Sequence, residues 1–453
     1  MITLFRSRKI VALVMVLFGA EIYALAAPLS PGLERFYIGD YGTSIYVSTL
    51  NLSTIKFGTA NAVGTQSSPS FLALTPNHKF LYAVNENGGT VLAYSVNPTN
   101  GALTFLNFLS TQGGGTPAFI TVDSSGSNVL VANYNGNNVN GGGSVIVFPI
   151  QPNGSMGAAT GFIQDPGISH AHCIAIDGNN HFVLVPDLGL DQVRCLVLNP
   201  VAGTLTTNTT LITPVAPGSG PRHIAFDPLY QRAYLICQNN STIVGFNFDS
   251  VNGILSAFQT NSTVTNGFPV GSNQTAEIAV HPSGRFLYGS NRGYNSIVVY
   301  AINPTNGMFS QVQQQFTDAT PRNFAIDPTG SYCIVASQDN NTIKLYSIDQ
   351  QTGKLTYTNQ TIATVSSPVC IVPFILAPPQ PVLSILPTLT NNLVLNISNS
   401  LNILTYQLYE SPDLASAGPT WNLVATGSPG QTNFVWTNTL SQEFFRAGVL
   451  TNF

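Results

Sequence analysis

The stretch SPSFLALTPNHKFLYAVNENGGTVLAYSV (68–96) holds three apolar runs separated by short polar turns, and the chain repeats this pattern five more times. The further copies are TPAFITVDSSGSNVLVANY (116–134), SHAHCIAIDGNNHFVLVPDLGLDQVRCLVL (169–198), GPRHIAFDPLYQRAYLICQNNSTIVGFNF (220–248), TAEIAVHPSGRFLYGSNRGYNSIVVYAI (275–302) and TPRNFAIDPTGSYCIVASQDNNTIKLYSI (320–348). Their spacing of about 50 residues is the size of a propeller blade. Each copy is expected to form strand A, a Pro/Gly/Asn turn, strand B ending in a polar pair, and strand C.

A fourth strand follows most copies through a short hairpin. Asn-Gly between apolar runs favours a hairpin because both residues tolerate positive φ. Such pairs, or the related Thr-Gly, stand at Asn100-Gly101, Asn252-Gly253, Asn306-Gly307 and Thr352-Gly353. Strand D is therefore expected after each turn.

The two ends of the repeat region supply a seventh unit. Residues 35–51 fit strands B and C with no strand A before them, whereas 366–374 fit a strand A with no strand B after it. Pairing the two closes the ring, and closure protects sheet edges. We predict an all-β chain with a seven-bladed β-propeller over 34–374, closed by N- and C-terminal strands in one blade.

The sequence outside this region differs in character. Residues 1–27 combine Arg6, Arg8 and Lys9 with the apolar run 10–18 and a small-residue end at 24–26, as in a secretory signal peptide. The apolar run is shorter than the roughly 20 residues that span a bilayer, although an uncleaved anchor remains the alternative. We expect export to the periplasm or cell exterior, with no transmembrane segment after signal removal.

At the other end, a Pro-rich linker is predicted at 375–381 and a small β-sandwich at 382–453. The sandwich would consist of about five short alternating strands. It is a candidate for surface or polymer attachment.

Composition narrows the classes of partner. A net charge of −4 with 8% charged residues gives no basic field, so nucleic acid is not an expected partner. The five cysteines have neither CxxC spacing nor clustered pairs, so we expect them to be small buried hydrophobic residues. They are Cys173, Cys195, Cys237, Cys333 and Cys370.

Polar residues concentrate at one end of the predicted inner strands. Aligning the A strands on their apolar positions gives one column of Phe71, Phe119, His172, His223, Glu277, Asn323 and Cys370. The position before it holds Ser70, Ala118, Ala171, Arg222, Ala276, Arg322 and Val369. Strand B runs antiparallel to A, so its end returns to the same face, carrying Asp40, Glu86, Asp187, Gln238, Arg292 and Gln338.

One channel mouth is thus expected to collect three arginines, two histidines and two glutamates. Arg35, Arg232 and Arg285 fall instead at the start of strand B, where we expect them to be solubilising. In a chain poor in charge, three converging guanidinium groups suggest an anion-binding pocket with an acid/base pair, because arginine forks match carboxylate and phosphate oxygens. The alternative is a structural ion-pair cluster that plugs the channel.

His170 and His172 are two residues apart, so they share a face only where the strand is regular. A metal site would need Glu277 and His223 as further ligands. No dedicated ligand motif is present, and we expect neither a metal nor another cofactor.

Several of these motifs resemble those of the lactonase-type seven-bladed propeller family, which includes the propeller form of 6-phosphogluconolactonase and fungal carboxymuconate cycloisomerases. The motifs are Gly-Pro-Arg-His (220–223), Ala-Glu-Ile (276–278), Ser-Asn-Arg-Gly (290–293), Thr-Pro-Arg (320–322) and His-Ala-His (170–172). The resemblance covers 34–374.

The resemblance implies metal-independent hydrolysis or formation of a lactone. His172 (or His170) and Glu277 would transfer protons. Arg222 and Arg292 would bind the anionic group and stabilise the oxyanion, with Arg322 in support. His170, His223, Glu86 and Gln238 would complete the substrate site.

One residue departs from the family pattern. Members commonly carry an acidic residue where this chain has Gln238, and a glutamine cannot accept a proton at neutral pH. Glu277 or Glu86 would have to serve in its place.

The leading hypothesis is therefore an exported lactone hydrolase, resembling 6-phosphogluconolactonase, that acts on a small anionic lactone or sugar acid. The alternative is a secreted, non-catalytic binding or scaffold propeller with a degenerate site. No tryptophan-docking repeat marks the blades, which disfavours a redox propeller with a quinone cofactor.

Overall fold

The computed structural model of the chain divides into two compact units. The larger comprises 33–375 except for 112–114, 137–140 and 270. The smaller unit consists of strands from both ends of the chain. The predicted cleavage site at 24–26 and nearly all of the predicted linker lie outside the described residues. In the part of the chain so described there is no helix, and hence none that could span a membrane.

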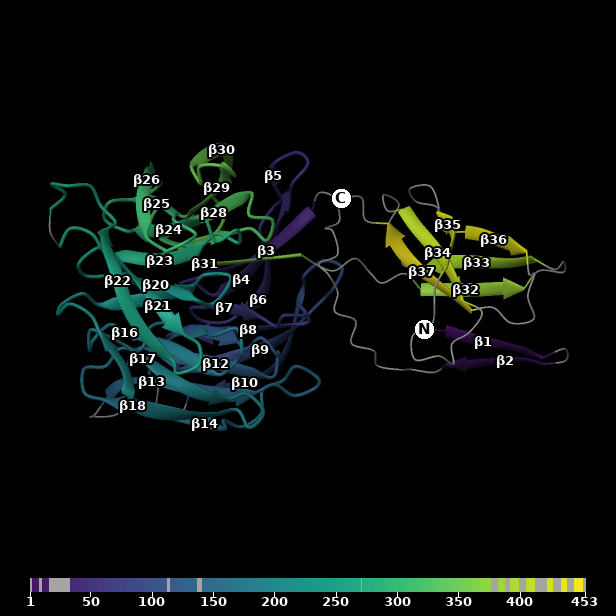
Figure 1. Cartoon of the computed structure of the whole chain (residues 1–453), viewed down its shortest axis with the longest axis horizontal. Helices are drawn as coiled ribbons and strands as arrows, with labels where there is room; N and C mark the ends of the chain where they lie inside the picture. Colours follow the sequence, from purple (N-terminus) through teal and green to yellow (C-terminus); the bar gives the residue numbers. More distant parts are fainter. Residues whose placement is uncertain are drawn as a thin grey trace. The chain divides into compact units, whose positions relative to one another are not determined.

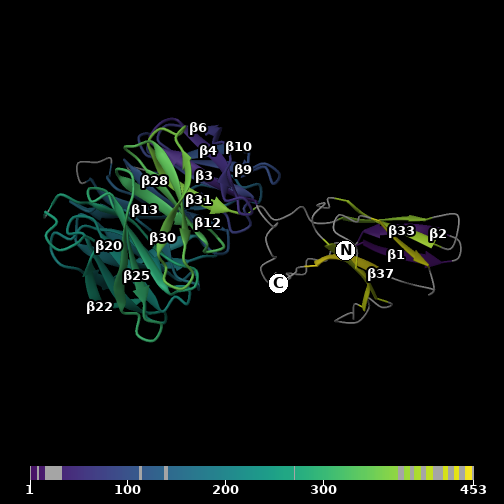
Figure 2. The same ribbon diagram turned by 90° about the horizontal axis from the view of Figure 1, so that it is seen from above.

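Seven antiparallel sheets make up the larger unit (Figures 1 and 2). In strand order A to D, blade 1 is β7 (Leu72–Leu74), β8 (Phe80–Asn85), β9 (Thr90–Val96) and β10 (Leu103–Ser110), and blade 2 is β11 (Pro117–Val122), β12 (Asn128–Asn133), β13 (Gly141–Pro149) and β14 (Gly161–Pro166). Blade 3 is β15 (Ala175–Ile176), β16 (Phe182–Asp187), β17 (Gln192–Asn199) and β18 (Thr204–Pro214), and blade 4 is β19 (Pro221–Phe226), β20 (Arg232–Cys237), β21 (Thr242–Asp249) and β22 (Ile254–Ser262). Blade 5 is β23 (Thr275–Val280), β24 (Phe286–Asn291), β25 (Ser296–Ile302) and β26 (Phe309–Phe316), and blade 6 is β27 (Pro321–Ile326), β28 (Tyr332–Ser337), β29 (Thr342–Ile348) and β30 (Leu355–Ile362).

Blade 7 is built from both ends of the ring, as predicted. Strand β31 (Pro368–Phe374) pairs antiparallel with β3 (Leu33–Asp40), in a register that places Arg35 opposite Phe374 and Gly39 opposite Cys370. Strand β4 (Ser44–Asn51) follows β3 and pairs with the short outer strands β5 (Lys56–Phe57) and β6 (Asn61–Thr65). The predicted seven-bladed propeller is therefore confirmed.

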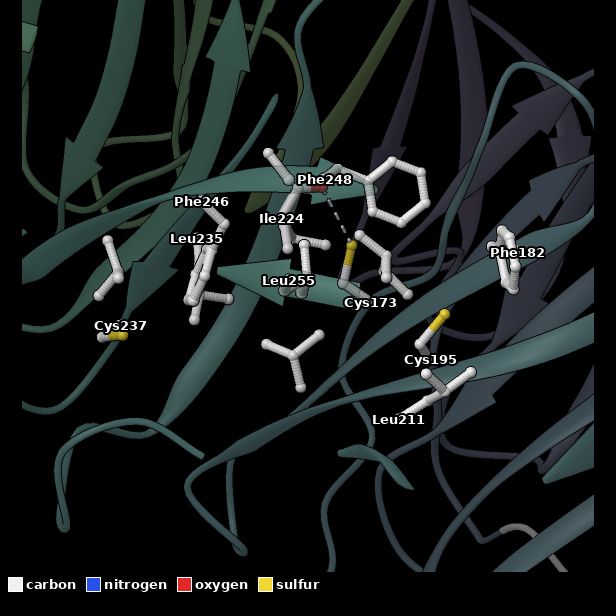
Figure 3. Packing of buried hydrophobic residues seen from close by; sticks show 14 residues of the cluster. Cys173, Phe182, Cys195, Leu211, Ile224, Leu235, Cys237, Phe246, Phe248 and Leu255 are labelled. Atoms are coloured by element: carbon white, nitrogen blue, oxygen red, sulfur yellow. Dashed lines mark hydrogen bonds between the residues drawn. The ribbon is translucent and has the colours of Figure 1, made fainter. Parts of the chain in front are cut away.

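Apolar side chains fill the layers between neighbouring blades. Between blades 3 and 4, for example, Cys173, Cys195 and Cys237 pack among Phe182, Phe246 and other buried residues (Figure 3). Burying a large apolar side chain contributes about 1.5–3 kcal/mol. All five cysteines are buried and unpaired, as expected from their scattered positions.

A repeated tyrosine in strand B ties each of several blades to the next. The hydroxyl of buried Tyr37 donates a hydrogen bond of 2.7 Å to the carbonyl of Gly101, a residue in the hairpin turn of the following blade. Tyr82, Tyr234 and Tyr288 make the same bond to Gly154, Gly307 and Gly353. Gly101 has φ +78°, so the Asn-Gly turn fixes the position of this carbonyl.

The arginines at the start of strand B are not merely solubilising. Arg35 and Arg232 donate to carbonyls of the next blade's hairpin, at Thr99 (2.7 Å) and Thr305 (2.9 Å), and Arg285 does so at Gln350. The prediction was wrong because strand alternation does not reveal that a neighbouring blade's turn lies within reach of these side chains.

In the smaller unit, β1 (Ile2–Ser7) pairs with β2 (Ile10–Met15). Six further strands form the three-stranded antiparallel sheets β32-β33-β36 and β35-β34-β37. Their bounds are Val382–Pro387, Asn392–Ser398 and Asn433–Thr437 for the first sheet, and Asn422–Thr426, Thr405–Ser411 and Phe444–Leu450 for the second. These strands include the expected ones, and their packing as a sandwich stays a prediction.

Candidate active site

A cavity of about 350 Å³ is lined by residues from all seven blades. Its lining comprises Tyr41, Ser70, Phe71, Glu86, Thr116, Ala118, Tyr134, Asn135, His172, Arg222, His223, Gln238, Glu277, Arg292, Arg322, Asn323 and Val369. Most of these residues lie at the start of strand A or just after the end of strand B. All the predicted site residues except His170 are among them.

A β-bulge at the start of strand A explains why consecutive residues reach one cavity. On a regular strand, successive side chains point to opposite faces. Here the pairing register shifts between Pro221 and His223, which leaves Arg222 as an extra residue. The same shift occurs around Arg322 in blade 6, and also around Ala118 and Val369. Bulges re-aim side chains, and Arg222 and His223 both line the cavity.

The predicted alignment of blade 3 is wrong by one residue. Leu188 N–H donates to the His170 carbonyl, and this bond corresponds to the one from Gln238 to Gly220 in blade 4. Asp177 accepts from the Phe182 amide as Asp227 does from Arg232. His172 is therefore equivalent to Arg222, and Cys173 to His223. The apolar run from Cys173 to Ile176 masked this register, because strand A is regular there only over Ala175–Ile176.

The predicted end of strand B needs the same correction in blades 3 and 7. The amides of Tyr41 and Tyr134 bond to strand A as that of Gln238 does, so these tyrosines occupy the position equivalent to Gln238. Asp40 precedes Tyr41 in blade 7, Asp187 precedes the equivalent Leu188 in blade 3, and neither aspartate lines the cavity. Tyr134 lies in blade 2, for which no residue at the end of strand B was predicted. Counting one residue past each strand B would have revealed Tyr41, Tyr134 and the neighbouring Asn135.

Two of the three arginines of the cavity are held by neutral groups. Arg292 donates to Gln238 Oε1 at 2.7 Å and to the Thr275 carbonyl at 3.2 Å. Arg322 donates to the Tyr41 hydroxyl at 2.5 Å and stacks 5.0 Å above that ring. Within the described residues, no ion pair joins any of the three to Glu277 or Glu86.

Arg222 is the most deeply placed of the three, with 3% of its surface exposed. Its Nε and Nη1 atoms have no hydrogen-bond partner in the part of the chain that the structure describes. Burial, and next the charge of Arg322, lower the pKa of Arg222 to about 10, so it stays charged at neutral pH. A buried, unpaired guanidinium is costly, and Arg222 is one of the residues that line the cavity.

Glu277 lies beside His223, with its Oε1 atom 2.9 Å from the imidazole Nδ1. Burial raises the pKa of Glu277 to about 7, against the opposing effect of Arg222. Burial, and next Arg222, lower the pKa of His223 well below its ordinary value. A carboxyl group poised near neutrality beside a neutral imidazole suits proton transfer.

His172 and His170 have different surroundings. His172 is 8% exposed, lines the cavity, and has its pKa lowered by burial and then by Arg222. The His170 ring instead stacks on Tyr134, with centroids 4.2 Å apart, and its Nδ1 lies 2.9 Å from the Tyr134 carbonyl oxygen. The two imidazoles are therefore not brought together, and the described residues contain no group of three or more ligands arranged for a metal ion.

The polar balance of the cavity favours an anion. Three guanidinium groups share the cavity with Glu86 and with Glu277, whose raised pKa of about 7 leaves it only partly ionised at neutral pH. Among the described residues, Ser70 Oγ, His172 Nδ1 and His223 Nε2 also lack a hydrogen-bond partner. Because buried polar groups are ordinarily paired, their concentration around one cavity marks it as a binding site.

Known proteins resemble the chain over its propeller. The family model for lactonases with a seven-bladed β-propeller matches residues 35–373. A 6-phosphogluconolactonase of Bacillus subtilis is 29% identical over 74% of this chain and 97% of its own length. The enzyme of the same name from Formosa agariphila is 30% identical, over 69% and 91%.

The solved structures agree with this assignment. A periplasmic gluconolactonase of Pseudomonas aeruginosa superposes with a TM-score of 0.71 at 26% identity, over 76% of this chain and all of its own. The residues that the family model matches form the seven blades and include all those that line the cavity. The chain belongs to the lactonase family of seven-bladed β-propellers.

Proposed function

We propose that this protein is an exported lactone hydrolase that opens an anionic, sugar-type lactone in the cavity, at the mouth of the propeller channel. The observation that carries the proposal is the set of three guanidinium groups around one cavity, none of which forms an ion pair with a carboxylate of the described residues. A volume of about 350 Å³ lies within the range of small-ligand sites. The relatives named 6-phosphogluconolactonase support the same class of reaction.

Each lining group fits one part of the reaction. Arg322 and Arg292 would bind the anionic substituent, and Arg222 would stabilise the oxyanion that forms as water attacks the lactone carbonyl. Glu277 and an imidazole, His172 or His223, would move the proton from water to the ring oxygen. Glu86 and Gln238 would contact hydroxyl groups, with His170 in support through Tyr134.

The hydrolysis rate of purified protein tests the proposal. In a pH-stat, wild type should open 6-phospho-δ-gluconolactone and δ-gluconolactone well above the spontaneous rate, and Arg222→Ala and Glu277→Ala should lose about 10²-fold or more of kcat/KM. Spontaneous opening in buffer is the necessary blank. Equal rates for all three proteins would contradict the enzyme assignment, and saturable binding without turnover would favour the binding or scaffold propeller.

Export is the second part of the proposal. It rests on the charged, apolar and small-residue segments of 1–27, and one structural relative is a periplasmic gluconolactonase. Amino-terminal sequencing of the mature protein should find cleavage near residue 27. An intact Met1 in a cytoplasmic fraction would contradict it. Attachment through 382–453 is tested by comparing the surface-bound fraction with and without that segment.

A further inference from the structure

Three cavity residues form one hydrogen-bonded chain across blades 4 to 7. His223 Nδ1 lies 2.9 Å from Glu277 Oε1, and Asn323 Nδ2 donates to Glu277 Oε2 at 2.5 Å. Asn323 Oδ1 in turn accepts from the Ile371 amide at 2.8 Å. His223, Glu277 and Asn323 occupy equivalent positions in three successive inner strands. We call this set the acid–imidazole chain.

The Ile371 amide fixes the orientation of the Asn323 side chain. A backbone N–H can only donate, so the Asn323 atom facing it is the oxygen, and the amide NH₂ must face Glu277. The Ile278 amide also donates to Glu277 Oε1, at 3.0 Å. Both carboxylate oxygens therefore already accept hydrogen bonds from protein groups, two at Oε1 and one at Oε2, so Glu277 is largely committed to holding the chain together.

His223, in contrast, has a ring nitrogen that makes no hydrogen bond within the described residues. With Nδ1–H donated to the ionised carboxylate, the neutral ring carries its lone pair on Nε2. His223 Nε2 is buried and has no partner among the described residues, although the residue lines the cavity. His172 lacks this support, because no carboxylate of the described chain bonds to its ring.

We infer that His223 is the residue that accepts the proton of the attacking water, that Glu277 acts through it, and that Asn323 is the positioning residue for the pair. This inference rests on the proposed lactone hydrolysis. As the water oxygen bonds to the lactone carbonyl carbon, its proton passes to His223 Nε2. When the ring C–O bond breaks, the imidazolium returns that proton to the departing oxygen. The products are one carboxylic acid and one hydroxyl group, with no other reactant.

Chemical rescue separates the two histidines. The kcat/KM of His223→Ala should fall by about 10²-fold or more. Added imidazole should restore at least about a tenth of the activity that this variant has lost. The rate of His172→Ala should not depend on imidazole. Rescue of His172→Ala alone, or full activity of His223→Ala, would overturn the inference and leave the proposed function standing. A wild type without lactonase activity would overturn both. Should His223→Ala fail to fold, His223→Gln takes its place in the rate comparison.

A tautomer measurement tests the same point without turnover. In ¹⁵N-histidine-labelled protein at neutral pH, His223 should show a protonated Nδ1 and an unprotonated Nε2. The opposite tautomer would contradict the inference.

Asn323→Asp tests the positioning role. The aspartate can still accept from Ile371, but it places a second carboxylate against Glu277 and removes the donor that favours ionisation. The acidic limb of the kcat/KM profile should move to higher pH. A lower melting temperature with an unmoved limb would show that Asn323 is merely structural.

Discussion

Replacing Arg222 by methionine should make the protein more stable and far less active. The guanidinium is 3% exposed, and two of its nitrogens have no partner among the described residues. An unsatisfied buried polar atom costs about 1–3 kcal/mol, and replacing even paired buried charges by apolar side chains of similar volume is often neutral or stabilises a protein by about 1–4 kcal/mol. We expect the free energy of unfolding to rise by about 1–3 kcal/mol, and kcat/KM to fall by about 10²–10³-fold through loss of the oxyanion donor.

Urea unfolding near pH 6, where Glu277 is mostly protonated, measures this stability change, and a pH-stat measures the rate. Arg194→Met is the matched control, since Arg194 in blade 3 is also buried but is ion-paired with Asp165 in blade 2. Breaking that pair should lower stability by about 3–5 kcal/mol. If Arg222→Met destabilised the protein as Arg194→Met does, the cavity arginines would be a structural plug, and the reasoning would be refuted.

Three further variants test the charges around the cavity and the closure of the ring. Gln238→Glu places a carboxylate against Arg292, so KM for an anionic lactone should rise about tenfold, while KM for a neutral lactone should change little. Equal increases of KM for the two lactones would contradict the role of Arg292 in anion binding. Tyr41→Phe removes the hydroxyl that holds Arg322, and steady-state kinetics should show a several-fold higher KM with kcat nearly unchanged. Glu34→Gln concerns a carboxyl group in β3 whose pKa burial, and next Asp327, raise to about 8. Because the folded pKa exceeds the unfolded one, wild-type stability should fall as pH rises from about 4.5 to 8, and chemical unfolding of the variant should lose that slope.

The blades were predictable because their signals are local. Asn-Gly turns and alternating apolar runs determine each hairpin, and the half-units at 35–51 and 366–374 require one another for closure. The inter-blade bonds of Tyr37 and Arg35 were not predictable, since their acceptor carbonyls lie in a different blade about 64 residues away.

The site was predictable in composition but not in register. Arg222 and Arg322 are extra residues in β-bulges, and a bulge breaks the two-residue period on which strand alignment depends. In blade 3 the apolar run beginning at Cys173 hid the one-residue offset, so His172 was placed with His223 rather than with Arg222. Tyr41 was missed because the more polar Asp40 precedes it, and Tyr134 because no strand B residue was predicted for blade 2.

A crystal structure of Glu277→Gln with an anionic lactone tests the central claim most directly, because the variant should hold its substrate unopened. We predict that the lactone lies in the cavity lined by all seven blades, with its carbonyl oxygen within hydrogen-bond distance of Arg222 and its anionic group on Arg322 and Arg292. A lactone bound elsewhere on the protein, or a cavity closed by direct pairing of these arginines with Glu86, would contradict it.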